Sequence, residues 1–161
     1  MLVEVGFDRF RVQDVATKAG CGTGAIYRRW PTKENLIIEA IKIMPTPVAP
    51  VTEDPISDLR ALVAPRCKSA QEKPDLVPGL ISAMRSDPGI EEVVKAGYTM
   101  ENFREVIIRI VGEDYPHISL LCEMTSAITL LRSAFIPQEI NAKKLTEEIV
   151  SFIESQGKLK G

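Results

Sequence analysis

The feature that most constrains this chain is a pair of short helical patterns joined by a glycine-containing turn near its start. Four apolar residues fall at the spacing i, i+3, i+4 and i+7, which places them on one face of a helix. They are Val12, Val15, Ala16 and Ala19. Gly20 follows directly, and glycine readily adopts the left-handed conformation that ends helices. The spacing therefore predicts a short helix that stops at Gly20.

The second helical pattern carries an aromatic anchor and two arginines. Ile26 and the only tryptophan of the chain, Trp30, lie four residues apart, so one short helix can bury both. Successive residues of a helix point about 100° apart. Tyr27, Arg28 and Arg29 are therefore expected on the outer face of this helix.

A third helix is predicted over "PTKENLIIEAIKIM", residues 31–44. Thr32 is its expected N-cap, because a threonine hydroxyl can accept a hydrogen bond from a free amide of the first turn. Lys33 then begins the helix. The apolar positions expected to face inward are Leu36, Ile37, Ala40, Ile41 and Met44.

A proline-rich segment, residues 45–55, follows with four of the eleven prolines of the chain. Proline lacks an amide donor and restricts the residue before it, so no helix is expected to pass through unbroken. Closely spaced prolines also make a segment stiff. We predict a linker here, between an N-terminal head, residues 1–44, and a helical body, residues 56–161.

The body reads as helical throughout, because no clean period-two alternation of the kind typical of strands is found. An all-α fold is therefore expected. The first helix of the body should kink or break at Pro65, since proline removes an intrahelical hydrogen bond. Helical spacing predicts elements at about residues 56–72, 75–85, 86–111, 117–135 and 138–155.

Charge is divided unevenly between the head and the rest of the chain. The whole chain has a net charge of −2, but residues 1–44 hold seven Lys or Arg against five Asp or Glu. A face that binds nucleic acid is therefore expected only in the head.

The composition argues against several classes of protein. Three separated cysteines and one histidine do not suit a structural zinc site, and no cofactor or metal is expected. We find no apolar stretch of membrane-spanning length and no secretion signal, which favours a cytoplasmic protein without a membrane partner. No nucleophile, base and orienting group appear at a recognisable spacing, so an all-helical enzyme is the least favoured hypothesis.

The chemistry of the two short helices suits DNA. A second helix joined by a tight turn can enter the major groove of double-stranded DNA, where base edges face its first residues. Close approach needs small side chains there, and the sequence offers Gly22, Thr23, Gly24 and Ala25. Tyrosine and arginine on its outer face can contact phosphates, and arginine can also contact guanine. Lys33, at the start of the next helix, adds a cation beside free amides that can hold a phosphate.

Other interpretations of this stretch stay open on the residues alone. Helix pairs with a glycine turn also occur in helical proteins that do not bind DNA, and two adjacent arginines often form a solvated surface. The run "GCGTG", residues 20–24, could indicate a nucleotide-binding loop. It follows no predicted strand, however, and matches neither of the glycine-rich phosphate-binding patterns.

The stretch "DVATKAGCGTGAIYRRWPTKENLI" resembles the DNA-binding head of TetR-family transcriptional repressors, over roughly residues 1–44. The elements shared in type and spacing are Val15-Ala16, Ala19-Gly20, Ile26-Tyr27, Arg28-Arg29, Trp30 and Thr32-Lys33-Glu34. In that family the residues matching Thr23, Gly24, Ala25 and Arg29 approach bases. Those matching Tyr27, Arg28 and Lys33 mostly hold phosphates, and Gln13 matches a position that sometimes reads a base.

The resemblance implies that the body binds a small effector and forms a homodimer through its last two helices, near residues 117–135 and 138–156. Both patterns are apolar over more than one stripe, which suits a dimer contact but also suits packing within one chain. Soft and aromatic side chains favour a largely apolar effector, although each would also suit an ordinary core. The candidates for lining its pocket are Met84, Tyr98, Met100, Phe103, His117 and Met124.

The head departs from the family pattern in two ways. Gly22 stands where a serine usually caps the recognition helix, and only "MLVEV" precedes Gly6-Phe7, where the family has a longer first helix. From the resemblance as a whole, we expect a repressor that a small-molecule effector releases from its operator. The alternative is a ligand-binding dimeric module of the same family that has lost DNA binding through a shortened head.

Overall fold

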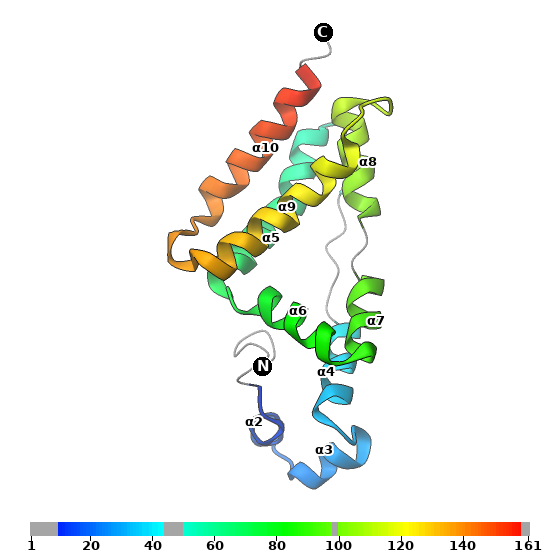
Figure 1. Cartoon of the computed structure of the whole chain (residues 1–161), viewed down its shortest axis with the longest axis vertical. Coiled ribbons are helices and arrows are strands. Elements are labelled where there is room, and N and C mark those ends of the chain that lie inside the picture. Colours follow the sequence, from blue (N-terminus) through cyan, green and yellow to red (C-terminus); the bar gives the residue numbers. More distant parts are fainter. Residues whose placement is uncertain (1–9, 44–49, 98–99, 159–161) are drawn as a thin grey trace. The chain divides into compact units, whose positions relative to one another are not determined.

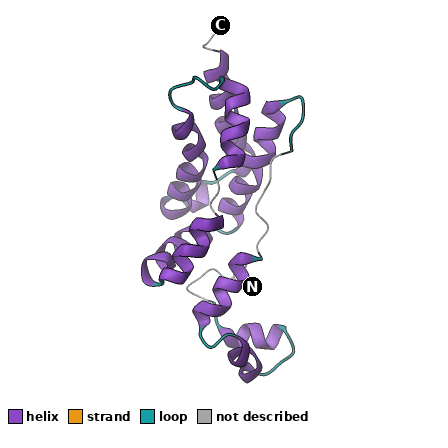
Figure 2. Cartoon of the chain, turned by 90° about the vertical axis from the view of Figure 1, so that its right-hand side faces the viewer, coloured by secondary structure: helices purple, strands orange, loops and turns teal. Residues whose placement is uncertain are grey.

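A computed structural model describes residues 10–43, 50–97 and 100–158 of the chain (Figure 1). Within these ranges the regular structure is helical and contains no strand (Figure 2), which confirms the all-α prediction. The chain divides into two compact units. The first comprises Met1–Thr46 and Asp75–Tyr98, and the second comprises Pro47–Pro74 and Thr99–Gly161.

The first unit contains the predicted pair of short helices. Here α2 (Val12–Lys18) contacts α3 (Thr23–Arg29), and α4 (Lys33–Lys42) follows. Two helices from later in the chain, α6 (Leu76–Ser86) and α7 (Pro88–Gly97), pack on each other, and α7 also packs on α4. The buried apolar core of this unit consists of Phe10, Val12, Ala16, Ile26, Leu36, Ile37, Ala83 and Ile90.

The presence of α6 and α7 in this unit differs from the expected division, which assigned all residues after 55 to one body. Ala83 of α6 is 4% exposed and Ile90 of α7 is 0% exposed, and both pack in the core of the first unit. Gly89 allows α7 to approach α4 closely, because a Cβ added there would lie 3.0 Å from Cδ1 of Ile38. The core around the two short helices is therefore completed by side chains from a distant part of the sequence.

The second unit is built around α5 (Pro55–Glu72). This helix contacts α8 (Glu101–Val111), α9 (Ile118–Phe135) and α10 (Ala142–Lys158), and α8 in turn contacts α9 and α10. A short 3₁₀ helix, η1 (Pro137–Glu139), connects α9 to α10 (Figure 1). The largest fully buried side chains of the second unit include Leu59, Leu62, Phe103, Ile107, Leu145 and Ile153.

One of the helix predictions is wrong and another is wrong in part. The helix expected over residues 86–111 is two helices in different units, since α7 ends at Gly97 and α8 begins at Glu101. A glycine in a helix interior is unfavourable, so Gly97 is a weak point in the predicted pattern. At Pro65 the sequence predicted a kink or a break; the break does not occur, because α5 continues through this residue, and the kink stays a prediction. Pro65 and Ala61 are both exposed, so water can bond the carbonyl that proline leaves without a donor.

A buried carboxylate holds the residues before α5 against α8. Asp58 is 0% exposed, and its two oxygens accept hydrogen bonds from the backbone amide of Thr52 at 3.0 Å and from the Thr52 hydroxyl at 2.8 Å. Arg109 of α8 donates to Asp58 Oδ2 at 2.6 Å and to the carbonyl of Thr52. Burial alone would raise the pKa of Asp58, but the hydrogen bonds from Thr52 and Arg109, with the arginine charge, bring it below its usual value.

One helix of the second unit is more apolar than the sequence led us to expect. Among the described residues, α9 has the length and mean hydropathy of a candidate membrane span, with a value of 1.3 over 18 residues. A third of it, 33%, is buried, and it packs on α5 and α8. A core helix of a soluble protein can have the same length and hydropathy, so this feature is weak evidence for a membrane.

Candidate DNA-binding surface

The turn between α2 and α3 has the backbone conformation that its glycines predict. Gly20 adopts a left-handed conformation with φ of 67°, and the amide of Cys21 donates to the carbonyl of Ala16 at 3.0 Å. Gly22 is the N-cap of α3, with an extended backbone and no side-chain hydrogen bond at the cap. The missing capping hydroxyl noted in the sequence is therefore not replaced by another side chain in the described structure.

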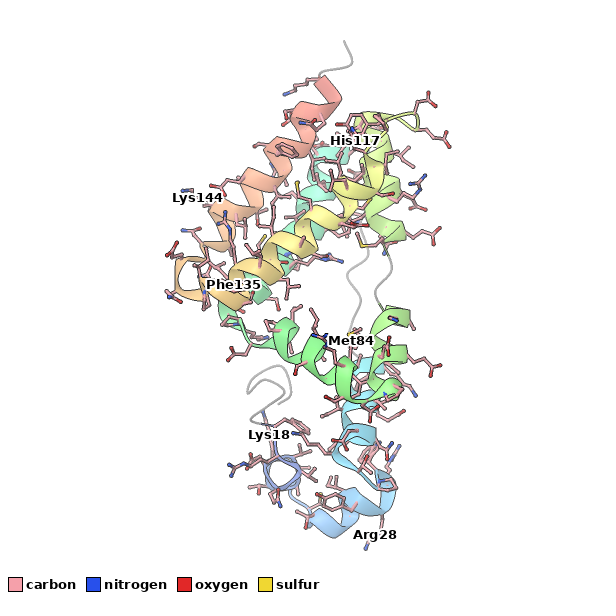
Figure 3. The ribbon with its side chains drawn as sticks, in the orientation of Figure 1. Lys18, Arg28, Met84, His117, Phe135 and Lys144 are labelled. Atoms are coloured by element: carbon pink, nitrogen blue, oxygen red, sulfur yellow. The ribbon has the colours of Figure 1, made fainter. Side chains whose placement is uncertain are left out.

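The outer face of α3 carries the predicted polar side chains. Ile26 is 7% exposed and packs in the core of the first unit, and Trp30 is partly buried against the same core. Tyr27, Arg28 and Arg29 are exposed, and Figure 3 shows Arg28 extending outward from α3. The helix therefore presents one phenol and two guanidinium groups to solvent, as the spacing predicted.

The first turn of α3 is small and open. Gly24 and Ala25 are exposed and Thr23 is partly exposed. A Cβ added to Gly24 would meet no atom within 4 Å, so no contact within the described structure requires glycine there. Glycine in a helix costs about 0.5–1 kcal/mol relative to alanine. The open position is consistent with a close approach of another molecule to the backbone of α3.

Two further predicted contact residues lie beside α3. Gln13 is exposed on α2. At the start of α4, the hydroxyl of Thr32 accepts a hydrogen bond from the amide of Asn35 at 3.1 Å, which confirms the predicted N-cap. Lys33 is the first residue of α4, and its ammonium lies 6.0 Å from the centroid of the Phe10 ring.

The structure thus places all the predicted DNA contacts in the first unit, on α2, α3 and the first residue of α4. These residues are Gln13, Thr23, Gly24, Ala25, Tyr27, Arg28, Arg29 and Lys33. Their individual roles in DNA contact stay predictions.

The predicted effector residues occupy several separate places. Met84 packs against the core of the first unit, whereas Phe103 is 1% exposed in the core of the second. Met100 lines a pocket of about 310 Å³ between α8 and α9. His117 and Met124 line a pocket of about 380 Å³ on α9 and α10, and Tyr98 lies outside the described residues.

A groove runs between α9 and α10. The pocket of about 380 Å³ and a second pocket of about 220 Å³ share Met124, Ile128 and Phe152, so we treat them as parts of one α9–α10 groove. A hydrogen bond from the segment before α9 and an ion pair from α9 itself reach α10 beside it. The hydroxyl of Tyr115 donates to Gln156 at 3.0 Å, and Arg132 pairs with Glu148 at 3.6 Å.

Large apolar side chains are exposed on the same two helices. Leu120, Leu131 and Phe135 of α9 are 63%, 59% and 76% exposed, and Phe152 of α10 is 48% exposed. Figure 3 shows Phe135 at one end of α9 and His117 beside the other. Large apolar side chains that are exposed near one another typically mark an interaction surface.

Sequence reasoning missed a buried polar group in α9. The hydroxyl of Thr125 is 0% exposed and has no hydrogen-bond partner among the described residues. Thr125, Thr129 and Ser133 are all buried and follow one another at four-residue spacing on an otherwise apolar helix. This spacing was the available signal, because polar residues repeated on the inner face of a helix need a partner.

The cysteines are divided between the turn and the second core. Cys21 is exposed, whereas Cys67 and Cys122 are buried, and burial raises the pKa of both of these thiols. A raised thiol pKa makes a cysteine a poor nucleophile. Within the described ranges, no group of three or more His, Cys, Asp or Glu side chains is arranged to hold a metal ion.

Comparison with known proteins adds to this geometry. Residues 1–40 match the model of a family described as bacterial regulatory proteins, tetR family. Similar curated proteins are uncharacterized HTH-type transcriptional regulators of Mycobacterium bovis and of two strains of Mycobacterium tuberculosis. Each is 28% identical over 97 residues, which cover 59% of this chain and 48% of the relative. The chain spans about half the length of these relatives.

The matched residues include α2, α3 and most of α4, which are the elements that carry the candidate surface. Over these N-terminal residues the chain is therefore similar to the tetR family of bacterial regulatory proteins.

Proposed function

We propose that the chain is a transcriptional repressor that binds double-stranded operator DNA through α3. The observation that carries this proposal is the division of α3 into two faces. Ile26 is buried in the core, while Tyr27, Arg28 and Arg29 lie outside it and are exposed. A helix held in this way can enter the major groove and keep its cationic groups directed at the DNA.

The ends of α3 support the same function. Thr23 and Ala25 at its start offer a hydroxyl and methyl groups to base edges, and Gly24 allows the backbone to approach. Beyond its other end, Lys33 begins α4, where free amides and a positive charge can hold a phosphate. The arrangement separates contacts that read bases from contacts that position the helix.

Binding to DNA upstream of the gene for this protein tests the proposal by electrophoretic mobility shift. We expect a shifted complex whose affinity falls when Arg28→Ala removes an exposed guanidinium of α3. Arg85→Ala is the matched control, because Arg85 is an exposed arginine of α6 in the same unit. Equal losses in the two variants would contradict a specific role for α3.

We further propose that the chain acts as a homodimer through α9 and α10. The support is the exposed apolar surface that contains Leu131 and Phe152. Two copies are needed if recognition helices are to enter successive major grooves, about 34–36 Å apart, on a two-fold symmetric site. Phe152→Glu should shift sedimentation toward the monomer, because a carboxylate would be desolvated at the contact. Ser151→Glu is the control. Ser151 is an exposed neighbour of Phe152 on another side of α10, so the same charge there should leave the dimer intact.

We propose that a small, largely apolar effector releases the protein from DNA. The pockets on α8, α9 and α10 support a ligand site in the second unit. A thermal-shift screen of small molecules would identify a ligand, and calorimetry would then compare its affinity with and without operator DNA. Release requires DNA to weaken ligand binding by the same factor as the ligand weakens DNA binding. Equal affinities would instead favour a ligand-binding dimer without a DNA switch.

A further inference from the structure

Two basic side chains of the candidate surface lie over aromatic rings of the same unit. The guanidinium carbon of Arg29 is 5.1 Å from the centroid of the Trp30 ring, and the ammonium of Lys33 is 6.0 Å from the centroid of the Phe10 ring. A cation within about 6 Å of a ring face is attracted by the electron density of that face. Each of these cations therefore has a preferred position on a ring.

The rings are themselves fixed by packing. Phe10 is 4% exposed within the core of the first unit, and Trp30 is partly buried against the same core. Trp30 is also the residue at which α3 ends, where the backbone becomes extended with φ of −128° and ψ of 95°. The indole of this residue lies beside the guanidinium of Arg29.

A cation held on a ring keeps the groups that it needs for binding. The planar guanidinium of arginine carries its N–H donors around its edge, so stacking on a face leaves them available to an acceptor. A long side chain that is already held loses less rotamer freedom when it binds. Arg28 differs from Arg29 in this respect. The contact between an arginine of α3 and an aromatic ring that is found among the described residues is made by Arg29.

We propose that Trp30 is a positioning residue for DNA binding, acting through Arg29, and that Phe10 serves Lys33 in the same way. The proposal rests on the DNA-binding function given above and extends it to two aromatic residues that a purely structural interpretation assigns to the core. The partner is duplex DNA, whose base acceptors and phosphates receive the held N–H groups.

A double-mutant cycle separates positioning from packing, since coupling appears only if one residue acts through the other. The measurement is fluorescence anisotropy with a duplex that the wild-type chain binds, for Trp30→Leu, Arg29→Met and the double variant. We expect Trp30→Leu to weaken binding by about two- to fivefold, which is the range for an exposed cation–aromatic contact. In the Arg29→Met background the same change should have almost no effect. The salt dependence should be the same for Trp30→Leu and the wild type, because the number of charges is unchanged.

Equal losses from Trp30→Leu in both backgrounds would overturn the proposal and leave Trp30 as a core residue only. If Trp30→Leu does not fold by circular dichroism, Trp30→Phe replaces it in the same cycle. Its smaller ring should lower affinity only while Arg29 is present. The cycle of Phe10→Leu with Lys33→Met tests the second pair by the same criterion. A wild-type chain that binds no duplex would overturn the DNA-binding function as well, whereas tight binding with additive losses overturns the positioning alone.

Discussion

The substitution Gly24→Ala should raise stability and lower DNA affinity at the same time. Gly24 is the second residue of α3, and a Cβ added there would meet no atom within 4 Å. Replacing a helical glycine by alanine gains about 0.5–1 kcal/mol, and the gain should be near the lower value because Gly24 lies in the first turn. No clash within the described structure offsets this gain.

The same methyl group should interfere with DNA if the backbone of α3 approaches base edges closely. Insertion of a methyl group into a well-packed contact costs about 1–3 kcal/mol, which is roughly fivefold or more in dissociation constant. The two effects therefore have opposite signs, and a loss of affinity could not be attributed to unfolding.

Urea denaturation followed by circular dichroism measures the first effect, and fluorescence anisotropy with a labelled duplex measures the second. Ser82→Ala is the control, because Ser82 is exposed in α6 and its replacement also favours the helix. The control should be stabilised without losing DNA affinity. If Gly24→Ala bound DNA as tightly as the wild type, the argument for close approach would be refuted. Lower stability would show that glycine has an internal role at this position.

Further predictions concern both units. Arg28→Ala should weaken binding to all duplexes alike and reduce the salt slope by about one, by anisotropy at several salt concentrations; a changed base preference with the wild-type slope would contradict the phosphate assignment. The pKa of Asp58 is lower in the folded state than in the unfolded state. Ionised Asp58 therefore stabilises the fold at pH values above its unfolded-state pKa, and this stabilisation is lost as the pH falls through its folded-state pKa. In urea denaturation, Asp58→Asn should therefore be less stable than the wild type at neutral pH and lose less stability between about pH 5 and pH 2; parallel profiles would refute this. A Cβ on Gly157 would lie 2.6 Å from the carbonyl oxygen of Ile110, and Gly157→Ala should destabilise by about 1 kcal/mol after its helix gain, again by urea denaturation. Unchanged or increased stability would show that the contact relaxes without cost.

The sequence predicted the parts of the site that depend on neighbouring residues. The positive φ of Gly20, the N-cap formed by Thr32 and the burial of Ile26 beside exposed Arg28 all follow from spacing over a few residues. Local rules of this kind hold because a helix determines which side chains share a face.

Contacts between distant segments could not be predicted in the same way. The apolar pattern of residues 86–111 is continuous, but Ile90 packs with the first unit and Ile107 with the second. Periodicity shows that each residue is buried without showing which partner buries it. The ring contact between Trp30 and Arg29 was also missed, because helical spacing assigns adjacent residues to different faces and says nothing about where α3 ends.

Helical spacing also did not predict which residues line each pocket. Met100 and Met124 have the soft side chains expected of an effector site, yet they line different pockets. One buried hydroxyl without a hydrogen-bond partner among the described residues is that of Thr125, and Thr125 lines neither of these pockets.

Selection of binding sites from a pool of random duplexes tests the central claim most directly. The full chain is incubated with the pool, bound DNA is recovered and amplified, and the enriched sequences are aligned. A dimer that inserts α3 from each copy should enrich an inverted repeat whose half-sites are centred about one helical turn, 34–36 Å, apart, or a multiple of that distance. Arg28→Ala should enrich the same repeat more weakly, since a phosphate contact carries no base preference. A folded dimer that enriches no sequence over the starting pool would contradict the account.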